Sequence, residues 1–337
     1  MSKFKVVVSD YNFKNLEKEK EIIESLGAKL VPCQCKSLEE LSFEARDADC
    51  LLIQYFRPVG EDLFGSCTRL RAVVRYGIGV DNIDIEAANR YGVMVVNVPD
   101  FCLDEVSDHA VAFILNLARK IKFQDSLVKK GSYDWKASIP LFRLKGKTVG
   151  LLGYGKIARL VAKKMLAFDT QVLFYDPFVE EDSSEKCKKV SLEELFSQSD
   201  FLSIHTPETN KTKHLLDSKK IGLMKKGSFL INTSRGGIID TEALIRSLES
   251  GHLAGAALDV IEGVPPISLE LPICRMENVI LTPHSAWYSE DSIKEVQEEA
   301  AKEVKRVLKG EVPKNLLNPD VLKKLKKPYG NKRGGDD

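Results

Sequence analysis

A glycine-rich turn at residues 153–158 is the clearest candidate in this sequence for binding a phosphate group. The apolar segment Thr148–Leu152 precedes it and has the composition of a buried strand. In such a turn Gly153 allows a tight bend, Gly155 lets the backbone approach a pyrophosphate, and the small Ala158 permits close helix–strand packing. The N-terminal end of the following helix then points at the phosphates. Ordinary strand-to-helix turns share this pattern, so it needs support from other residues.

An acidic residue follows the next strand at the distance that a dinucleotide site requires. The expected strand Gln171–Tyr175 ends at Asp176, about 20 residues beyond the turn. A carboxylate here accepts hydrogen bonds from the 2′- and 3′-hydroxyls of a ribose and repels a 2′-phosphate. The turn and Asp176 together predict a dinucleotide site that prefers NAD to NADP.

An arginine lies in a glycine-flanked loop after a later strand. The run Asn232-Thr233-Ser234-Arg235-Gly236-Gly237 follows the expected strand Ser228–Asn232. The carboxyl ends of parallel strands form the edge at which such folds bind ligands, and a guanidinium matches a carboxylate with two parallel hydrogen bonds. Arg235 is therefore a candidate for binding a carboxylate ligand. The alternative is a surface ion pair.

A histidine and an aspartate stand at two further strand ends. His284 follows the expected strand Val279–Leu281, and Asp259 ends the small-residue strand Ala254–Leu258. Imidazole is the usual proton carrier near neutral pH, which makes His284 a candidate acid or base. The alternative is a structural histidine. The carboxylate of Asp259 either hydrogen-bonds a nicotinamide or caps a turn.

The composition of the chain is that of a globular protein with two domains. The 337 residues are 43% hydrophobic and 29% charged, and a formal net charge of +1 gives no electrostatic case for nucleic acid or acidic partners. The apolar run Val6–Val8 is too short for a signal peptide or a membrane span. The seven cysteines have no metal-site spacing, so we expect free thiols, no metal and a cytoplasmic location.

Apolar segments that alternate with helical segments predict an α/β fold with parallel sheets covered on both faces. In the first part of the chain we expect strands at 5–9, 29–32, 50–54, 72–76 and 93–98, and helices at 16–26, 38–45 and 85–91. In the second part we expect strands at 149–152, 171–175, 201–204, 228–232, 254–258 and 279–281. One long helix is expected over 104–130, and a last helix over 289–308 that returns to the first domain.

The order and spacing of these motifs resemble those of the D-2-hydroxyacid dehydrogenase family. The resemblance extends from Leu70 to about Val312. Three stretches resemble one branch of this family more closely, the phosphoglycerate dehydrogenase-like branch of the C-terminal-binding-protein type. They are Arg75–Asp84, Val98–Asp100 and Thr282–Glu290.

This resemblance implies two doubly wound parallel-sheet domains with NAD in the cleft between them. A flavodoxin-like substrate domain would comprise residues 1–103 and 290–337, and a Rossmann cofactor domain residues 104–289. It also implies a homodimer, because relatives dimerise through the segment that matches the long helix. The implied substrate is a 2-oxo acid that is interconverted with a D-2-hydroxy acid.

The resemblance further assigns roles to individual residues. Arg235 would bind the substrate carboxylate and carbonyl, and His284 would protonate the carbonyl oxygen while NADH delivers hydride. The loop Tyr76-Gly77-Ile78-Gly79 would offer backbone N–H groups to the carboxylate. Pocket-lining positions match Gln54, Tyr55 and Trp287. The cofactor positions match Ser107, Gly153, Gly155, Lys156, Ile157, Asp176, Thr206, Thr233, Ser234, Arg235, Asp259 and His284.

One position departs from the family pattern. The family has a Glu that pairs with the catalytic histidine, and Val264 stands there in this chain. A carboxylate partner orients an imidazole and favours its protonated form. Glu262 has the right chemistry but lies two residues earlier. Three interpretations remain open: catalysis assisted by Glu262 or another carboxylate, slower or lower-pH catalysis by an unassisted histidine, and loss of dehydrogenase chemistry.

Two alternative functions follow from the same residues. The similarity to C-terminal-binding proteins and the missing Glu favour an NAD(H)-responsive, corepressor-like protein-binding module with little or no dehydrogenase activity. Retention of Arg235 and His284 favours the enzyme, since a binding module does not need them. A substrate with a different anionic group, such as a phosphonate or a sugar acid, is the third possibility.

Overall fold

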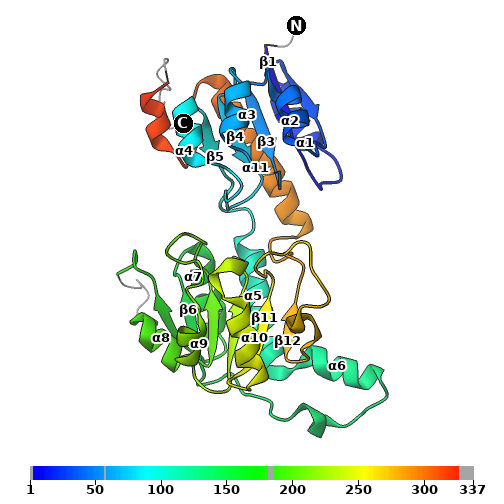
Figure 1. The fold of residues 1–337 in the computed structure, drawn as a ribbon, viewed down its shortest axis with the longest axis vertical. Coiled ribbons are helices and arrows are strands. Elements are labelled where there is room, and N and C mark those ends of the chain that lie inside the picture. The colour runs from blue at the N-terminus through cyan, green and yellow to red at the C-terminus, as the bar shows by residue number, and fades with distance from the viewer. Residues whose placement is uncertain (1–2, 57, 181–185, 326–337) are drawn as a thin grey trace. The chain divides into compact units, whose positions relative to one another are not determined.

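The chain forms two compact units, each built around its own parallel sheet (Figure 1). The computed structural model describes residues 3–56, 58–180 and 186–325. The first unit comprises residues 1–102 and 289–337, and the second unit residues 103–288. The last residues of the expected first domain, 326–337, lie outside the described part.

The first unit contains a five-stranded parallel sheet in the order β2-β1-β3-β4-β5. The strands are β1 (Phe4–Val8), β2 (Ala28–Pro32), β3 (Cys50–Ile53), β4 (Ala72–Arg75) and β5 (Met94–Val96). Val6, Val7 and Val8 are all fully buried although neighbours on a strand face opposite sides, so both faces of the sheet are covered. The expected parallel sheet is confirmed here.

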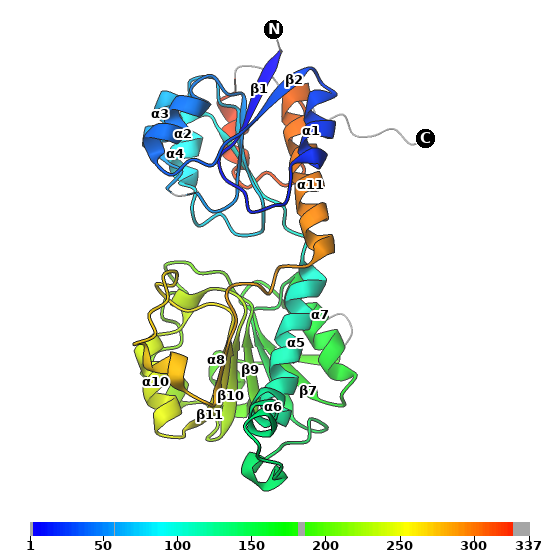
Figure 2. The same ribbon diagram turned by 90° about the vertical axis from the view of Figure 1, so that its right-hand side faces the viewer.

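Helices pack on both faces of this sheet (Figure 2). They are α1 (Glu17–Glu24), α2 (Leu38–Ala45), α3 (Glu61–Ser66), α4 (Ile85–Tyr91), α11 (Glu290–Lys309) and the 3-10 helix Pro319–Lys323. The expected return of the last helix is confirmed, because α11 packs against α1. A reciprocal capping box between Ser289 and Ser292 starts α11. The six-residue α3 is too short to show a helical period, and the sequence did not predict it.

The second unit contains a seven-stranded parallel sheet in the order β12-β11-β10-β9-β6-β7-β8. The strands are β6 (Thr148–Leu152), β7 (Gln171–Tyr175), β8 (Cys187–Lys189), β9 (Phe201–Ile204), β10 (Ser228–Asn232), β11 (Leu253–Leu258) and β12 (Val279–Leu281). Six of these strands were expected. The three-residue edge strand β8 was not, because Cys187-Lys188-Lys189 lacks an apolar run.

The helices of the second unit are α5 (Leu103–Arg119), α6 (Ile121–Lys129), α7 (Lys156–Leu166), α8 (Leu192–Gln198), α9 (Ser218–Gly222) and α10 (Thr241–Glu249). Helix α5 packs on α7, and the apolar side chains Ala110, Ile114, Val161 and Met165 are buried in the same core. This core lies on the face of the sheet that also buries Val149 and Leu151 of the strand before the glycine turn.

The expectation of one continuous helix over residues 104–130 is wrong. The helix ends at Arg119, and Lys120 has a left-handed φ of 50° before α6 begins. The reason is packing: α5 has eight buried residues, whereas α6 has none. Because α6 buries no side chain, tertiary packing does not stabilise one continuous helix across Lys120.

Candidate functional site

All the candidate loops of the second unit leave from one row of residues across its sheet. The strand register places these residues side by side at the carboxyl ends of six strands: Tyr175, Leu152, Ile204, Asn232, Leu258 and Leu281. The carboxyl edge of a parallel sheet is where such folds bind ligands. The motifs of the sequence, which are spread over more than a hundred positions from Gly153 to His284, therefore share one edge.

The glycine turn has the conformation that a phosphate-binding turn requires. Gly153 has a φ of 90°, and a Cβ there would lie 2.9 Å from the carbonyl carbon and oxygen of His205. No other residue fits this position. A Cβ on Gly155 would meet no atom within 4 Å, so the backbone at the start of α7 is open to a ligand. Burial lowers the pKa of His205 to about 4, and this neutral imidazole bonds the Ser203 hydroxyl at 2.8 Å.

Asp176 holds the glycine turn through its carboxylate. The N–H of Tyr154 donates to Oδ2 at 2.8 Å, and the N–H of Phe178 donates to Oδ1 at 2.8 Å. A carboxylate has about four acceptor sites, so two remain for ribose hydroxyls. Asp176 thus lies where the sequence predicts the acidic residue of an NAD site.

The Arg235 loop is fixed by its neighbours. The side chain of Asn232 accepts from the N–H of Ser234 at 2.9 Å and donates to the carbonyl of Arg235 at 2.8 Å. The Ser234 hydroxyl donates to the carbonyl of Thr206, which ties this loop to the end of β9. The side chain of Arg235 is half-buried, and its Nη1 donates to the carbonyl of Ser234 at 2.8 Å.

The turn that follows Arg235 requires glycine at position 236, where a Cβ would meet backbone atoms, whereas at position 237 it would meet the movable end of a side chain. A Cβ on Gly236 would lie 2.2 Å from the carbonyl carbon of Ile261, and one on Gly237 would lie 2.6 Å from Glu208 Oε1. The close approach of the segment at Ile261 to Gly236 positions the loop after β11 against the arginine loop.

The hydroxyl of Thr233 indicates a missing ligand at this edge. Its Oγ1 is buried and has no hydrogen-bond partner among the described residues. A buried polar group without a partner costs about 1–3 kcal/mol, which a bound group can recover. Together with the open backbone at Gly155, this orphaned hydroxyl fits the cofactor that the resemblance implies.

His284 lies on a loop that is held by Asp259. The Asp259 carboxylate accepts from the Thr282 hydroxyl at 2.5 Å, the N–H of Ser285 at 2.8 Å and the N–H of Ala286 at 2.9 Å. The N–H of His284 donates to the backbone carbonyl of Asp259 at 2.9 Å. Asp259 therefore does cap a turn, and the single bond at its Oδ2 leaves that oxygen able to accept one more. The imidazole of His284 is exposed.

Glu262 has a partner other than His284. Its Oε1 and Oε2 lie 2.8 and 2.9 Å from Nε2 of His214, a residue that the sequence analysis did not single out. Val264 is half-buried, and its N–H donates to the carbonyl of Ile261 at 3.3 Å. In this structure Glu262 does not take the place of the carboxylate missing at Val264.

The remaining cofactor candidates of the second unit differ in exposure. Ser107 on α5 is fully buried, and its hydroxyl accepts from Lys164 at 2.6 Å and donates to the carbonyl of Asp104 at 3.0 Å. Lys156 at the start of α7 is exposed, and Ile157 beside it is half-buried. The half-buried Trp287 packs edge-on against Tyr288.

In the first unit, an aspartate that the sequence analysis did not assign organises the candidate pocket residues. The carboxylate of Asp10 accepts the N–H groups of Gln54, Tyr55 and Phe56 at 3.1, 2.6 and 3.1 Å. The amide of Gln54 is buried and accepts from the N–H of Asn12, whereas the Tyr55 side chain is exposed. The only sequence feature that could have identified Asp10 is its position as an acidic residue just after the first strand.

The expected substrate loop Tyr76-Gly77-Ile78 offers fewer N–H groups than the sequence implied. The N–H of Tyr76 donates to the carbonyl of Ile53 at 2.8 Å, and that of Gly77 donates to the carbonyl of Arg75 at 2.9 Å. Both groups already have acceptors because β4 pairs with β3 and then turns. Within the described residues the N–H of Ile78 has no acceptor.

The side chain of Tyr76 belongs to a buried cluster. Its hydroxyl donates to Glu19 Oε1 at 2.9 Å, and the amide of Gln297 donates to the same carboxylate at 3.1 and 3.0 Å. Burial raises the pKa of Glu19, and burial together with the Glu19 charge raises that of Tyr76.

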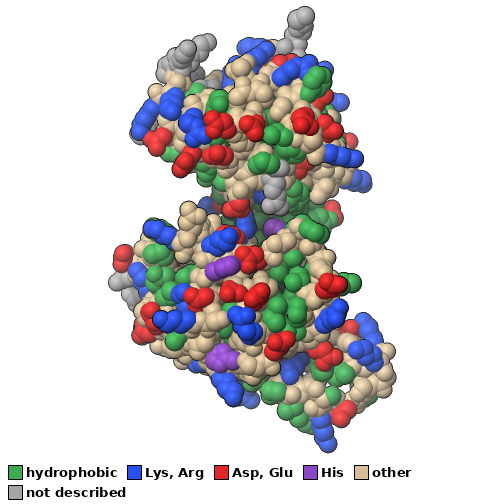
Figure 3. Space-filling model, viewed as in Figure 1, with side chains coloured by type: hydrophobic (Ala, Val, Ile, Leu, Met, Phe, Trp, Pro, Cys, Tyr) green, Lys and Arg blue, Asp and Glu red, His purple; other side chains and the backbone are tan. Residues whose placement is uncertain are grey.

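The described part of the chain contains no group of three or more metal-ligating side chains. None of its helices is long and apolar enough to cross a membrane. On the face shown in Figure 3, acidic and basic side chains are interspersed over both units.

Comparisons with known proteins define the class. Residues 111–286 match the family described as D-isomer specific 2-hydroxyacid dehydrogenase, NAD binding domain. A glyoxylate reductase of Thermococcus litoralis is 37% identical over 289 residues, which cover 83% of this chain and 86% of that protein. A D-3-phosphoglycerate dehydrogenase of Methanocaldococcus jannaschii is 36% identical over 299 residues, which cover 86% of this chain and 56% of that protein.

A solved structure supports the same class. The D-lactate dehydrogenase of Aquifex aeolicus, complexed with NAD and lactic acid, superposes with a TM-score of 0.82 and 30% identity. The match covers 95% of this chain and 98% of that one. The chain therefore belongs to the D-isomer specific 2-hydroxyacid dehydrogenase family. It is an NAD-dependent oxidoreductase of this type, and the matched NAD-binding domain lies in the second unit.

Proposed function

We propose that this protein reduces a 2-oxo acid to a D-2-hydroxy acid, with Arg235 binding the substrate carboxylate and His284 donating the proton. The observation that carries the proposal is the common edge of β10, β11 and β12, from which the Arg235, Asp259 and His284 loops all leave. Reduction needs a cation for the carboxylate and a proton donor for the developing alkoxide, and one sheet edge supplies both.

The chemistry divides between the cofactor and the protein. NADH, when bound, supplies the hydride. The glycine turn and Asp176 would hold its adenosine half, and the orphaned hydroxyl of Thr233 would hydrogen-bond the part near β10. Oδ2 of Asp259 would accept from the nicotinamide carboxamide while its other bonds keep the His284 loop in place. Arg235 would orient the carboxylate with its planar fork.

The chain has no carboxylate at position 264, where the family pattern has one. Val264 replaces the acid that the family pattern has there, and Glu262 is bound to His214. An imidazole without an adjacent carboxylate is less protonated at neutral pH. We therefore propose that any carboxylate that assists His284 belongs to a residue other than 262 or 264.

The first unit would contribute to substrate binding. We propose that the N–H of Ile78 donates to the substrate carboxylate, in place of the N–H groups of Tyr76 and Gly77, which already have acceptors. Gln54, held by its bond to Asn12, would present a fixed amide to the substrate.

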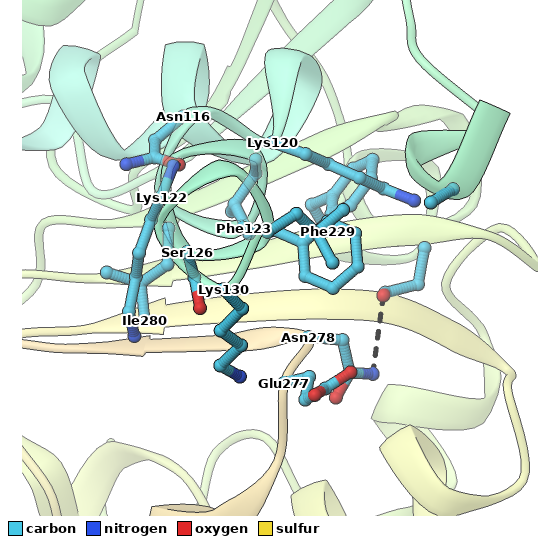
Figure 4. Close-up of a pocket in the computed structure, with 14 residues that line it drawn as sticks. Asn116, Lys120, Lys122, Phe123, Ser126, Lys130, Phe229, Glu277, Asn278 and Ile280 are labelled. Carbon is cyan, nitrogen blue, oxygen red and sulfur yellow. Dashed lines mark hydrogen bonds between the residues drawn. The ribbon is translucent and has the colours of Figure 1, made fainter. Parts of the chain in front are cut away.

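We also propose a homodimer in which residues 121–139 contact a second copy. Five apolar side chains of this segment are exposed, among them Tyr133 at 94% and Trp135 at 67%. A cavity of about 420 Å³ lies at its base, between α6 and strands β10 to β12 (Figure 4). Phe123 and Phe229 line it. An exposed apolar segment of this kind favours an interface.

The test of the proposed function is NADH oxidation with a panel of 2-oxo acids between about pH 5 and 8. We expect turnover of at least one 2-oxo acid, and loss of turnover in Arg235→Gln although this variant still binds NADH. No turnover of any 2-oxo acid, with NADH demonstrably bound, would overturn it. Size exclusion with and without NADH addresses the protein-binding alternative, which an NADH-dependent change of oligomeric state in a catalytically inactive protein would favour.

A further inference from the structure

A second histidine is connected to the His284 loop by hydrogen bonds. His109 lies on α5, and its Nε2 is 3.1 Å from the hydroxyl oxygen of Thr282. That hydroxyl is 2.5 Å from Oδ1 of Asp259. The chain His109–Thr282–Asp259 therefore joins a helix, the end of β12 and the end of β11, all within the second unit.

The direction of these hydrogen bonds follows from the chemistry of the groups. An ionised carboxylate only accepts, so the single hydroxyl proton of Thr282 is donated to Asp259. The oxygen of Thr282 must then accept from His109, which requires a proton on Nε2 of that imidazole. Burial lowers the pKa of His109, while the charge of Asp259 opposes this effect. A neutral imidazole with its proton on Nε2 agrees both with the direction of the hydrogen bond to Thr282 and with the lowered pKa of His109.

The loop beyond Thr282 needs such support. His284 has a φ of 53°, in the left-handed region that a residue with a Cβ seldom adopts. Its N–H donates to the backbone carbonyl of Asp259 at 2.9 Å, and the next two N–H groups, of Ser285 and Ala286, donate to the Asp259 carboxylate. Asp259 is only 2% exposed, so its orientation depends on its hydrogen-bond partners. The conformation at His284 therefore depends on where the Asp259 carboxylate points.

We propose that His109 is a positioning residue for His284, which acts through Thr282 and Asp259 to hold the backbone that carries the proton donor. This inference rests on the proposed role of His284 in reduction. The hydrogen bonds from residues 284–286 to Asp259 fix the backbone that carries the imidazole, whatever its ring contacts. His109 does not touch the reacting atoms in this scheme.

A purely packing role for His109 makes a different prediction. The ring of His109 also packs edge-on against Phe113, with centroids 4.4 Å apart. His109→Leu keeps most of the volume and removes the donor, whereas His109→Gln keeps an N–H donor near the position of Nε2. If packing alone matters, the leucine variant should be the better substitute. If the hydrogen bond matters, glutamine should be.

The experiment combines kinetics with hydrogen exchange on the full-length protein. For His109→Leu we expect kcat for 2-oxo acid reduction to fall at least about tenfold, since a misplacement near 1 Å can cost about a hundredfold. KM for the 2-oxo acid should stay within about threefold, because the Arg235 loop after β10 takes no part in the hydrogen bonds from His109 through Thr282 to Asp259. His109→Gln should restore most of the rate, and Thr282→Val should behave like His109→Leu.

Hydrogen exchange of the peptide covering residues 282–288 provides a readout without activity. We expect the amides of Ser285 and Ala286 to exchange at least about tenfold faster in His109→Leu, and near the wild-type rate in His109→Gln. The matched control is His252→Leu, a half-buried histidine of the same unit whose Nε2 bonds the carbonyl of Ile221. It should leave this peptide and kcat unchanged.

Two outcomes separate this inference from the proposed function. If the wild type reduces no 2-oxo acid, the proposed function fails, and the exchange of residues 282–288 still decides whether His109 holds the loop. If the wild type is active but His109→Leu keeps its kcat and its slow exchange at Ser285 and Ala286, the inference is overturned and the function stands. A leucine variant that outperforms glutamine in both readouts overturns it as well.

Discussion

The carboxylate of Glu262 is hydrogen-bonded to Nε2 of His214, with both oxygens within 2.9 Å of that nitrogen. His214 is itself fixed, because its N–H donates to the carbonyl of Gly237 at 2.7 Å. The pair links the loop after β9 to the loop after β11. It therefore engages the nearest acidic residue to position 264 in the sequence, and it leaves the proposed proton donor His284 without assistance from Glu262.

Restoring the carboxylate tests the consequence of Val264. In Val264→Glu we expect faster 2-oxo acid reduction at neutral pH, because a carboxylate beside an imidazole raises the pKa of the imidazole and keeps it protonated. The high-pH limb of the kcat/KM profile should move upward by about one pH unit. Val264→Gln, which has the size but not the charge, is the control and should not move the limb. Equal profiles for all three proteins would show that a carboxylate at this position does not reach His284.

Replacement of Arg235 by lysine separates charge from geometry. Lysine keeps the positive charge but not the planar fork that binds a carboxylate with two hydrogen bonds. We expect kcat/KM for the 2-oxo acid to fall by about 30-fold or more. The dissociation constant of NADH, measured by fluorescence, should change little because the adenosine half is held by the glycine turn. Unchanged kinetics in Arg235→Lys would contradict the proposed contact.

Asp176 determines cofactor choice in this account. Asp176→Asn keeps an acceptor for the N–H of Tyr154 but removes the charge that repels a 2′-phosphate. We expect the preference for NADH over NADPH, as a ratio of kcat/KM values, to fall by at least about tenfold. The thermal midpoint should fall only slightly, since the carboxamide oxygen keeps the bond from the N–H of Tyr154 while the N–H of Phe178 loses its acceptor. An unchanged ratio would mean that other residues exclude NADPH.

The buried Glu19 makes stability depend on pH. Burial raises its pKa above the usual 4.5, so the folded state binds this proton more tightly than the unfolded state. The resulting stabilisation is complete below pH 4.5 and is lost as the pH rises through the raised pKa. We expect the free energy of unfolding of the wild type, relative to Glu19→Gln, to decline over that window and then become level.

Urea unfolding at a series of pH values measures this difference. The exposed Glu17 on the same helix provides the control, because Glu17→Gln changes the net charge equally without touching the buried cluster. A difference between wild type and Glu19→Gln that does not vary with pH would show that Glu19 has no raised pKa in the folded protein.

Much of the fold was predictable because the strands are short, apolar and rich in β-branched residues. The run Val6–Val8 shows this pattern, whereas the strand Leu253–Leu258 has no β-branched residue and was predicted, from Ala254 onward, as a run of small apolar residues. The site loops were predictable for a related reason: each candidate follows a strand end, and parallel strands place their ends at one edge. The break at Lys120 was not predictable, since it depends on α6 having no surface to cover.

The hydrogen-bond partners of the site residues could not be predicted from the sequence. Glu262 and His214 are 48 positions apart, and His109 and Thr282 are 173 apart. No local pattern connects residues at such separations, because the contacts arise between elements that meet only in the folded protein. The same holds for Tyr76, whose hydroxyl donates to Glu19, a residue of α1 that lies 57 positions earlier in the sequence.

The configuration of the product provides the most direct test of the central claim. A 2-oxo acid with a distinguishable product, such as pyruvate, is incubated with NADH and the purified protein, and the 2-hydroxy acid is resolved on a chiral column. We expect the D-isomer from the wild type and little product from His284→Gln, at an NADH concentration that saturates both proteins. An L or racemic product, or equal D-product from His284→Gln, would contradict that claim.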